Sequence, residues 1–165
     1  AETIDGYARL LSSADALDSA SKVCDFVLRL LDGRERNGPA YNLITNILGL
    51  LDADPRAARR EVGLAFRAKM LLASGFSPEL GLCVQCAATA GLAAFSPSAG
   101  GIVCGDCRAA GDFDFGRDAY AFMSGAIGSP LADAPAAGPE ALRQTDRAIS
   151  EIVAHHAHVH VRQLV

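Results

Sequence analysis

Cys83-Val84-Gln85-Cys86 and Cys104-Gly105-Asp106-Cys107 are two C-x₂-C pairs, and 17 residues separate them. Two residues between paired cysteines allow a tight turn that directs both sulfurs to one point. Two such turns supply the four ligands of a tetrahedral metal ion, and this spacing is typical of four-cysteine zinc sites. The sequence therefore predicts one structural Zn²⁺ held by Cys83, Cys86, Cys104 and Cys107.

Three other uses of the paired cysteines are less favoured. A redox pair would require a thioredoxin-like βαβ context, which the surrounding sequence lacks. Disulfides are expected in oxidising compartments, whereas the five cysteines are an odd number and the first residues show no signal-peptide pattern. A catalytic zinc needs an open coordination position, which four thiolates would close.

The residues between the two pairs predict a small β-hairpin. Leu92–Ser96 and Ile102-Val103 are short apolar segments, and the turn-forming residues 97–101 join them. From Gly81 onward the helical periodicity is lost. We therefore expect a zinc ribbon at residues 81–112, inserted into another structure.

Amphipathic helices are predicted on both sides of this insertion. A weak helix is expected over residues 3–11, and a second one follows an N-cap at Ser13. Two more are expected to start at Pro39 and at Asp54-Pro55, the latter running to about Ser74 with Gly75 as its C-terminal stop. A helix from about Arg117 to before Gly128 and another from Pro139 complete the set.

These elements predict a mainly α fold, a helical bundle with an inserted four-cysteine ribbon. Residues 1–80 would form the first part of the bundle and residues 113–165 the second. In the helix after Ser13, the expected apolar stripe is Leu17, Ala20, Cys24, Val27, Leu28 and Leu31. Cys24 would then be a small buried hydrophobic residue.

Composition limits the possible functions. Half of the 165 residues are hydrophobic and 6% are aromatic, and no apolar run reaches the 18 residues that would suggest a membrane span. The net charge of −4 argues against strong autonomous binding to nucleic acids. No pattern typical of a catalytic site is present, so we do not expect an enzyme.

Positive charge is concentrated in one segment, residues 56–69, which we call the charged segment. It contains a single acid, Glu61, and five basic residues: Arg56, Arg59, Arg60, Arg67 and Lys69. Two interpretations stay open, a solvated helix face or a binding site for an acidic partner. The apolar stripe Val62, Phe66, Met70 and Ala73 is expected to face the bundle.

The histidines near the C-terminus are weaker candidates for a site. His155, His156, His158 and His160 contain one i, i+4 pair but no neighbouring carboxylate or cysteine to complete a ligand set. Ordinary packing or surface positions are the favoured interpretation.

Two longer stretches resemble a known family. Gly75-Phe76-Ser77-Pro78-Glu79-Leu80, ahead of the first cysteine pair, and Phe95-Ser96-Pro97-Ser98-Ala99-Gly100-Gly101, ahead of the second, resemble the bacterial RecO family of recombination mediators. A weaker similarity extends from about Asp15 to the last helix. The resemblance implies a non-enzymatic role in DNA repair and recombination after DNA damage, in the bacterial cytoplasm at the nucleoid.

The same resemblance implies particular partners and activities. They are single-strand annealing and help in loading RecA onto DNA covered by single-strand-binding protein (SSB), with RecR and the acidic C-terminal tail of SSB as partners. Family members begin with an OB-fold domain, which no segment before Ala1 supplies, so we expect this chain to be a fragment or a processed form. DNA would be contacted mainly through that OB-fold. A stand-alone zinc-ribbon adaptor without a DNA role is the alternative.

Two departures from the family pattern concern the ribbon and the C-terminus. Ala87 stands where the family often has glycine, and residues 159–165 carry little charge where the family often has a basic tail. We therefore expect this chain alone to bind single-stranded DNA weakly.

Overall fold

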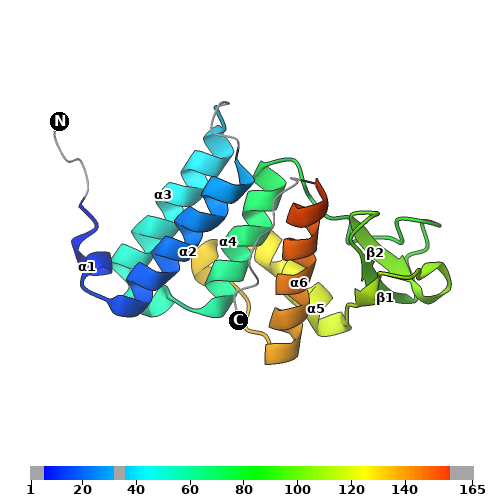
Figure 1. The fold of residues 1–165 in the computed structure, drawn as a ribbon. Coiled ribbons are helices and arrows are strands. Elements are labelled where there is room, and N and C mark those ends of the chain that lie inside the picture. The colour runs from blue at the N-terminus through cyan, green and yellow to red at the C-terminus, as the bar shows by residue number, and fades with distance from the viewer. Residues whose placement is uncertain (1–5, 32–35, 157–165) are drawn as a thin grey trace.

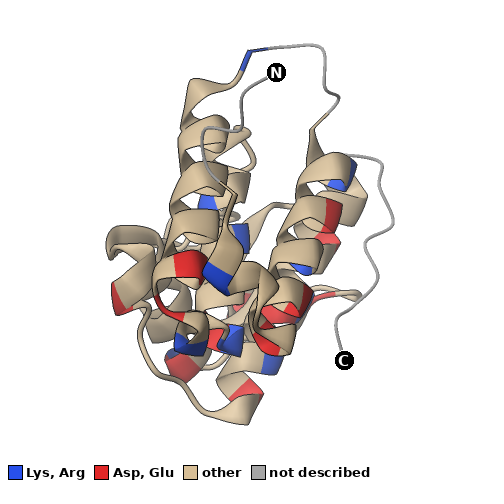
Figure 2. Cartoon of the chain, turned by 90° about the vertical axis from the view of Figure 1, so that its left-hand side faces the viewer, with Lys and Arg blue, Asp and Glu red and all other residues tan. Residues whose placement is uncertain are grey.

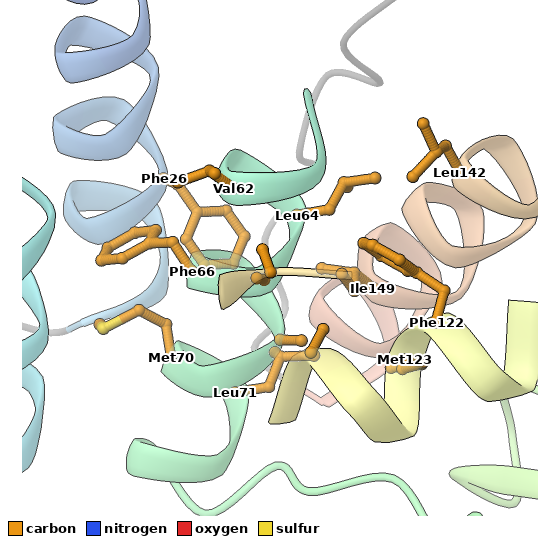
Figure 3. Packing of buried hydrophobic residues seen from close by; sticks show 14 of the residues in the cluster. Phe26, Val62, Leu64, Phe66, Met70, Leu71, Phe122, Met123, Leu142 and Ile149 are labelled. Atoms are coloured by element: carbon orange, nitrogen blue, oxygen red, sulfur yellow. The ribbon is translucent and has the colours of Figure 1, made fainter. Parts of the chain in front are cut away.

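Helix α4 (Arg60–Ala73) lies at the centre of the fold, surrounded by α2 (Ala14–Leu30), α3 (Gly38–Ala53), α5 (Arg117–Gly128) and α6 (Pro139–His156) (Figure 1). The computed structural model describes residues 6–31 and 36–156. Helix α4 is buried on most of its surface, because neighbouring helices pack against it from several sides. Its buried residues are Val62, Leu64, Ala65, Phe66, Arg67, Ala68, Met70 and Leu71. Figure 3 labels the five larger hydrophobic side chains among them.

The remaining elements are shorter. Helix α1 (Ala8–Leu11) precedes α2, and 3₁₀ turns lie at Pro55–Ala57, Gly105–Cys107 and Leu131–Asp133. A small sheet, formed by the part of the chain that joins α4 to α5, lies at one end of the bundle (Figure 1). The predicted mainly α fold with a small inserted hairpin is therefore confirmed. Within the described residues, no helix is long and apolar enough to cross a membrane.

The start of α4 differs from the prediction. Asp54 does cap a turn, since its carboxylate accepts a hydrogen bond from the Arg56 N–H at 3.0 Å, but this turn is a separate 3₁₀ segment, Pro55–Ala57. The backbone is extended at Arg59, and α4 begins only at Arg60. Ala57 is buried, so the short turn places a small side chain in the core before the helix begins.

The end of α4 follows the prediction. Gly75 has a φ of 81°, the left-handed conformation that glycine adopts without steric cost. The Phe76 N–H donates to the Leu71 carbonyl at 2.8 Å and the Gly75 N–H to the Leu72 carbonyl at 3.1 Å. This pair of hydrogen bonds is a Schellman motif, which satisfies carbonyls at the helix C-terminus.

The N-cap predicted for α2 is confirmed, and α3 also begins with a side-chain cap. Ser13 accepts a hydrogen bond from the Ala16 N–H, and Asn37 caps α3, with Pro39 in its first turn. Helix α1 is shorter than predicted: Gly6 and Tyr7 precede it, and residues 1–5 lie outside the described residues.

Helix α2 confirms only part of its predicted apolar stripe, since Ala20 is buried and Val27 and Leu31 pack partly buried against the core. Its buried residues are Ala16, Ala20, Val23, Phe26 and Leu30, whereas Leu17, Cys24 and Leu28 are exposed. Small alanines on the inner face let neighbouring helices approach closely, and Phe26 fills the space beside α4. The prediction that Cys24 is buried is therefore also wrong.

The sheet has the order β2-β1-β3. Strand β1 (Leu92–Ser96) pairs antiparallel with β2 (Gly101–Cys104), as predicted, and on its other edge with β3 (Phe113–Asp114), which sequence analysis missed. We call residues 79–114 the cysteine ribbon. Side chains alternate across it, because Phe95 and Ile102 join the bundle core while Ala94 and Val103 pack with Cys83 and Cys104.

Gly101 allows the chain before the first cysteine to run close alongside β2, where Glu79 and Gly101 form a parallel β-bridge. A Cβ at this position would lie 2.6 Å from both the Glu79 carbonyl oxygen and Val84 Cγ1. The Ile102 N–H donates to the same carbonyl at 2.9 Å, which holds the two segments together.

Gly101→Ala is therefore expected to destabilise the protein by about 1–3 kcal/mol, as overpacking does. Urea unfolding followed by circular dichroism measures this. Gly105→Ala is the matched control, because a Cβ there would meet nothing within 4 Å. Equal stability of the two variants would contradict the role given to Gly101.

Candidate metal centre and partner-binding cleft

The first cysteine turn is closed by its own backbone. The Ala87 N–H donates to the Cys83 carbonyl and the Cys83 N–H to the Ala88 carbonyl, each at 2.8 Å. Ala87 has a φ of 60°, a left-handed conformation that favours glycine. This geometry explains why a glycine would suit the position. The second turn is the 3₁₀ segment Gly105–Cys107, whose Gly105 N–H donates to the Gly91 carbonyl at 3.2 Å.

These turns bring the four predicted cysteines together. The sulfur atoms of Cys83, Cys86, Cys104 and Cys107 all lie within 4.8 Å of one another. The Sγ atoms of Cys86 and Cys104 are 3.7 Å apart. A tetrahedral ion with metal–sulfur bonds of about 2.3 Å would separate its ligands by about 3.8 Å. The cluster therefore has the dimensions of a metal site.

The pKa values of two thiols in this cluster are shifted in opposite directions. Hydrogen bonding to the backbone at Cys104, then at Cys86 and Gln85, lowers the pKa of Cys83 to about 6 despite its burial. The neighbouring side chains, first Cys86 and then Cys104, raise the pKa of Cys107 to about 12. Crowded sulfurs thus resist losing all their protons, and a divalent cation would offset the repulsion between four thiolates.

The cluster is partly open to solvent. Cys83 and Cys104 are buried, Cys107 is half-buried and Cys86 is exposed. Among the described residues, this is the one group of histidines, cysteines and carboxylates with metal-site geometry. His155 is exposed, the side chain of His156 is outside the described set, and His158 and His160 also lie outside the described residues.

The five basic residues of the charged segment do not share one surface. Arg56, Arg59 and Arg60 are exposed, but Arg67 is buried in the core. The Lys69 ammonium donates to the Ile127 carbonyl at 2.6 Å, near the C-terminal end of α5, and partial burial lowers its pKa. The expectation that Arg67 is available to a partner is therefore wrong, because Arg67 is buried in the core, whereas Lys69 is partly buried and holds a backbone carbonyl.

Arg67 forms a buried ion pair that sequence analysis missed. Its guanidinium contacts the Asp146 carboxylate, donates to Ser150 Oγ at 3.2 Å and lies 4.9 Å from the centre of the Phe26 ring. Its Nε is buried without a hydrogen-bond partner among the described residues. Burial lowers the pKa of Arg67, while Asp146 opposes that shift. Asp146 thus neutralises the positive charge of Arg67, for which the charged segment itself offers no partner other than Glu61.

Beside this ion pair lies a cleft of about 290 Å³ between α2 and the N-terminal half of α4, which we call the α2–α4 cleft. Its apolar walls include Val23, Ile47, Leu51, Val62 and Phe66. Arg59, which directly precedes α4, and Arg60, its first residue, line the cleft on one side, and Asp15, Asp18 and Lys22 line it from α2. Figure 2 shows basic and acidic residues mixed over the lower part of the bundle. The cleft thus combines an apolar interior with guanidinium groups.

The fold and the cluster together define a class of protein: a helical bundle that carries a four-cysteine ribbon between its fourth and fifth helices. Residues 11–164 match the family described as recombination protein O, C-terminal. The chain therefore belongs to this family.

Curated relatives agree with the family match. A DNA repair protein RecO from Desulforudis audaxviator is 34% identical over 116 residues, which are 66% of this chain and 43% of that protein. The RecO of Symbiobacterium thermophilum is 31% identical over 67% of this chain and 45% of its own length. That of Rubrobacter xylanophilus is 27% identical over 97% of this chain and 64% of its own. The chain thus spans about half the length of these relatives.

Proposed function

We propose that this chain serves DNA repair and recombination as the scaffold and partner-binding half of a non-enzymatic, RecO-like mediator. Membership of the family supports a repair role, and the relatives that share it are named as DNA repair proteins. In this proposal, annealing of single strands, help in loading RecA and contact with RecR belong to the whole mediator. Its DNA contacts lie mainly in an OB-fold domain, and it acts in the cytoplasm at the nucleoid.

The metal proposed for the cysteine cluster is one structural Zn²⁺. Cys83, Cys86, Cys104 and Cys107 would hold it, because thiolates are ligands that zinc prefers and the sulfur spacing suits a tetrahedron. Four thiolates leave no open position, so the ion would stabilise the ribbon and carry no reaction step. It would also link the two cysteine turns, which come from separate segments of the chain.

The α2–α4 cleft is the proposed site for the acidic tail of SSB. The observation that carries this proposal is the apolar cleft of about 290 Å³ with Arg59 and Arg60 along it. A tail that ends in acids and an apolar residue needs a hydrophobic pocket beside basic groups. The planar guanidinium pairs with a carboxylate through two hydrogen bonds, which suits Arg59 and Arg60 to a C-terminal carboxylate.

Replacing Arg59 and Arg60 together by alanine is expected to weaken binding of an SSB tail peptide at least tenfold, about 1.4 kcal/mol. The salt dependence of binding should fall as well, because two positive charges are removed from the site. Fluorescence anisotropy with a labelled peptide measures both quantities. Arg67 is left intact in this variant, since its removal would disturb the core.

Arg56→Ala is the matched control. Arg56 is exposed in the same segment but does not line the cleft, so its removal should change peptide affinity less than about twofold. Unchanged peptide binding by the double variant would refute the cleft as the tail site and leave the basic segment as a solvated surface.

A further inference from the structure

The outer surface of α2 carries a row of weakly polar side chains that the bundle does not bury. Its members are Leu17, Ser21, Cys24 and Leu28, all exposed, and we call this row the outer α2 stripe. Leu17 is 44% and Leu28 80% exposed, although α2 lies against α3 and α4 along its other side (Figure 1). The described residues therefore leave a nearly apolar stripe of α2 uncovered.

The spacing of the stripe is that of a helix–helix seam. Its members follow one another at intervals of four, three and four residues, the alternation that keeps one line of side chains facing a second helix. The Ser21 hydroxyl donates to the Leu17 carbonyl at 2.9 Å, so covering it would leave no unmet donor. The stripe thus has the pattern of a surface that packs against another helix.

A row of four charges runs beside the stripe, each one position after a stripe residue. Asp18 pairs with Lys22 at 2.7 Å, and Asp25 pairs with Arg29 at 3.0 Å. We call these four residues the charged row of α2. Its charges sum to zero and alternate in sign along the helix, beginning with an acid and ending with a base.

This alternation makes the charged row complementary to itself when it is reversed. If a second copy of α2 lies antiparallel on the stripe, Leu17 comes level with Leu28 of that copy. Asp18 then lies toward Arg29 of the second copy, and Lys22 toward its Asp25. A parallel copy would instead bring each charge beside its like, which is unfavourable. The charges therefore favour one orientation of one particular partner, a second copy of this chain.

The neighbouring helix α3 adds no repulsion to such a pair. Helix α2 packs against α3, and residues 38–51 of α3 contain no charged side chain. Two copies of a chain with a net charge of −4 repel each other overall, so a contact between them needs a surface of this kind. Depletion of charge is also what distinguishes the centre of a protein interface from the rest of the surface.

We propose that two copies of this chain pair through the outer α2 stripe, with their α2 helices antiparallel about a two-fold axis. Such an interface uses the same patch on both copies, which is the commonest arrangement in dimers. The 17 residues of α2 give a contact about 25 Å long. One helix face buries less than the roughly 800 Å² per partner of a standard interface, so the pair is weak and forms at high local concentration.

Sedimentation velocity of this chain over about 10–500 µM measures the pairing, since a small interface gives an affinity in this range. The average sedimentation coefficient should rise with concentration toward that of a dimer. Leu28→Glu should weaken the association at least tenfold, because the pair would bury two uncompensated carboxylates. Leu28 is 80% exposed, so the variant should fold as the parent does, which circular dichroism checks. Leu72→Glu is the matched control, since Leu72 is also exposed but lies on α4.

Mixing two charge variants tests the antiparallel orientation. Lys22→Asp places an acid toward Asp25 of an identical copy, and Asp25→Lys places a base toward Lys22, so each variant alone should associate less than the parent. A mixture of the two should associate as well as the parent, because every facing pair is then of opposite sign. Loss of the exposed ion pairs within one helix cannot produce this rescue, since both variants keep that loss in the mixture.

A parent that remains monomeric at 500 µM would overturn the second copy as the occupant of the stripe. Equal weakening by Leu28→Glu and Leu72→Glu would overturn the specific surface in favour of general repulsion. Association without rescue in the mixture would overturn the antiparallel pair. No peptide or metal is added in these measurements, so their result is independent of the function proposed for the α2–α4 cleft.

Discussion

Cys104→Ser and Cys83→Ser are each expected to lower bound zinc from about one ion per chain to a small fraction of that value. A serine hydroxyl is a poor zinc ligand, and three remaining thiolates hold the ion less tightly. The free energy of metal binding is also free energy of folding, and the small core of the ribbon contributes little in its place. The cysteine ribbon should therefore unfold in both variants.

The helical bundle should keep most of its helix content in these variants, with a lower midpoint of thermal unfolding. The reason for the lower midpoint is that Phe95, Ile102 and Phe113 of the ribbon belong to the bundle core. Phe95 also lies 5.6 Å from the ring of Phe115, next to α5. Unfolding the ribbon exposes this shared surface, whereas the packing around α4 does not depend on the cysteines.

Elemental analysis of zinc and circular dichroism measure the two effects separately. Cys24→Ser is the matched control, because Cys24 is exposed on α2 and lies outside the cluster. That variant should keep its zinc and its stability. Parent protein purified without chelator that contains less than about half a zinc per chain would refute the structural zinc.

Local sequence patterns predicted the structure correctly where the conformation depends on one short segment of the chain. The cysteine turns, the β1–β2 hairpin and the Gly75 stop each depend on residues close together in the chain. The spacing of the cysteines thus predicted the cluster that the structure assembles. The short strand β3 could not be found in this way, because two residues carry no periodicity.

Prediction failed where burial depends on several neighbouring helices. Helix α4 is enclosed by four helices, so the face carrying Arg67 is buried although the sequence suggested one apolar stripe. In α2 the prediction placed Leu17 and Leu28 on the inner face, whereas packing against the neighbouring helices buries Ala16, Val23 and Phe26 beside the correctly predicted Ala20. The sequence did contain one overlooked signal: Asp146 interrupts the apolar stripe of α6 between Leu142 and Ile149.

The buried Asp146 is the basis of the second large expected effect, a loss of stability. Asp146→Leu should destabilise the protein by about 3–5 kcal/mol, the cost of leaving the Arg67 charge buried without its partner. The two side chains are 7% and 5% exposed, so water cannot replace the missing carboxylate. For a chain of this size the midpoint of thermal unfolding should fall by roughly 6–20 °C. Differential scanning calorimetry measures the change.

The double variant Arg67→Met, Asp146→Leu separates the charge effect from simple loss of packing. Removing both charges should restore most of the stability, because well-packed apolar side chains often replace a buried ion pair at little or no cost. Glu140→Ala, which breaks the exposed pair with Arg143 on the same helix, should cost less than about 1 kcal/mol. If Asp146→Leu costs no more than Glu140→Ala, then Asp146 does not compensate Arg67, and the buried guanidinium must be stabilised by Ser150 and Phe26 alone.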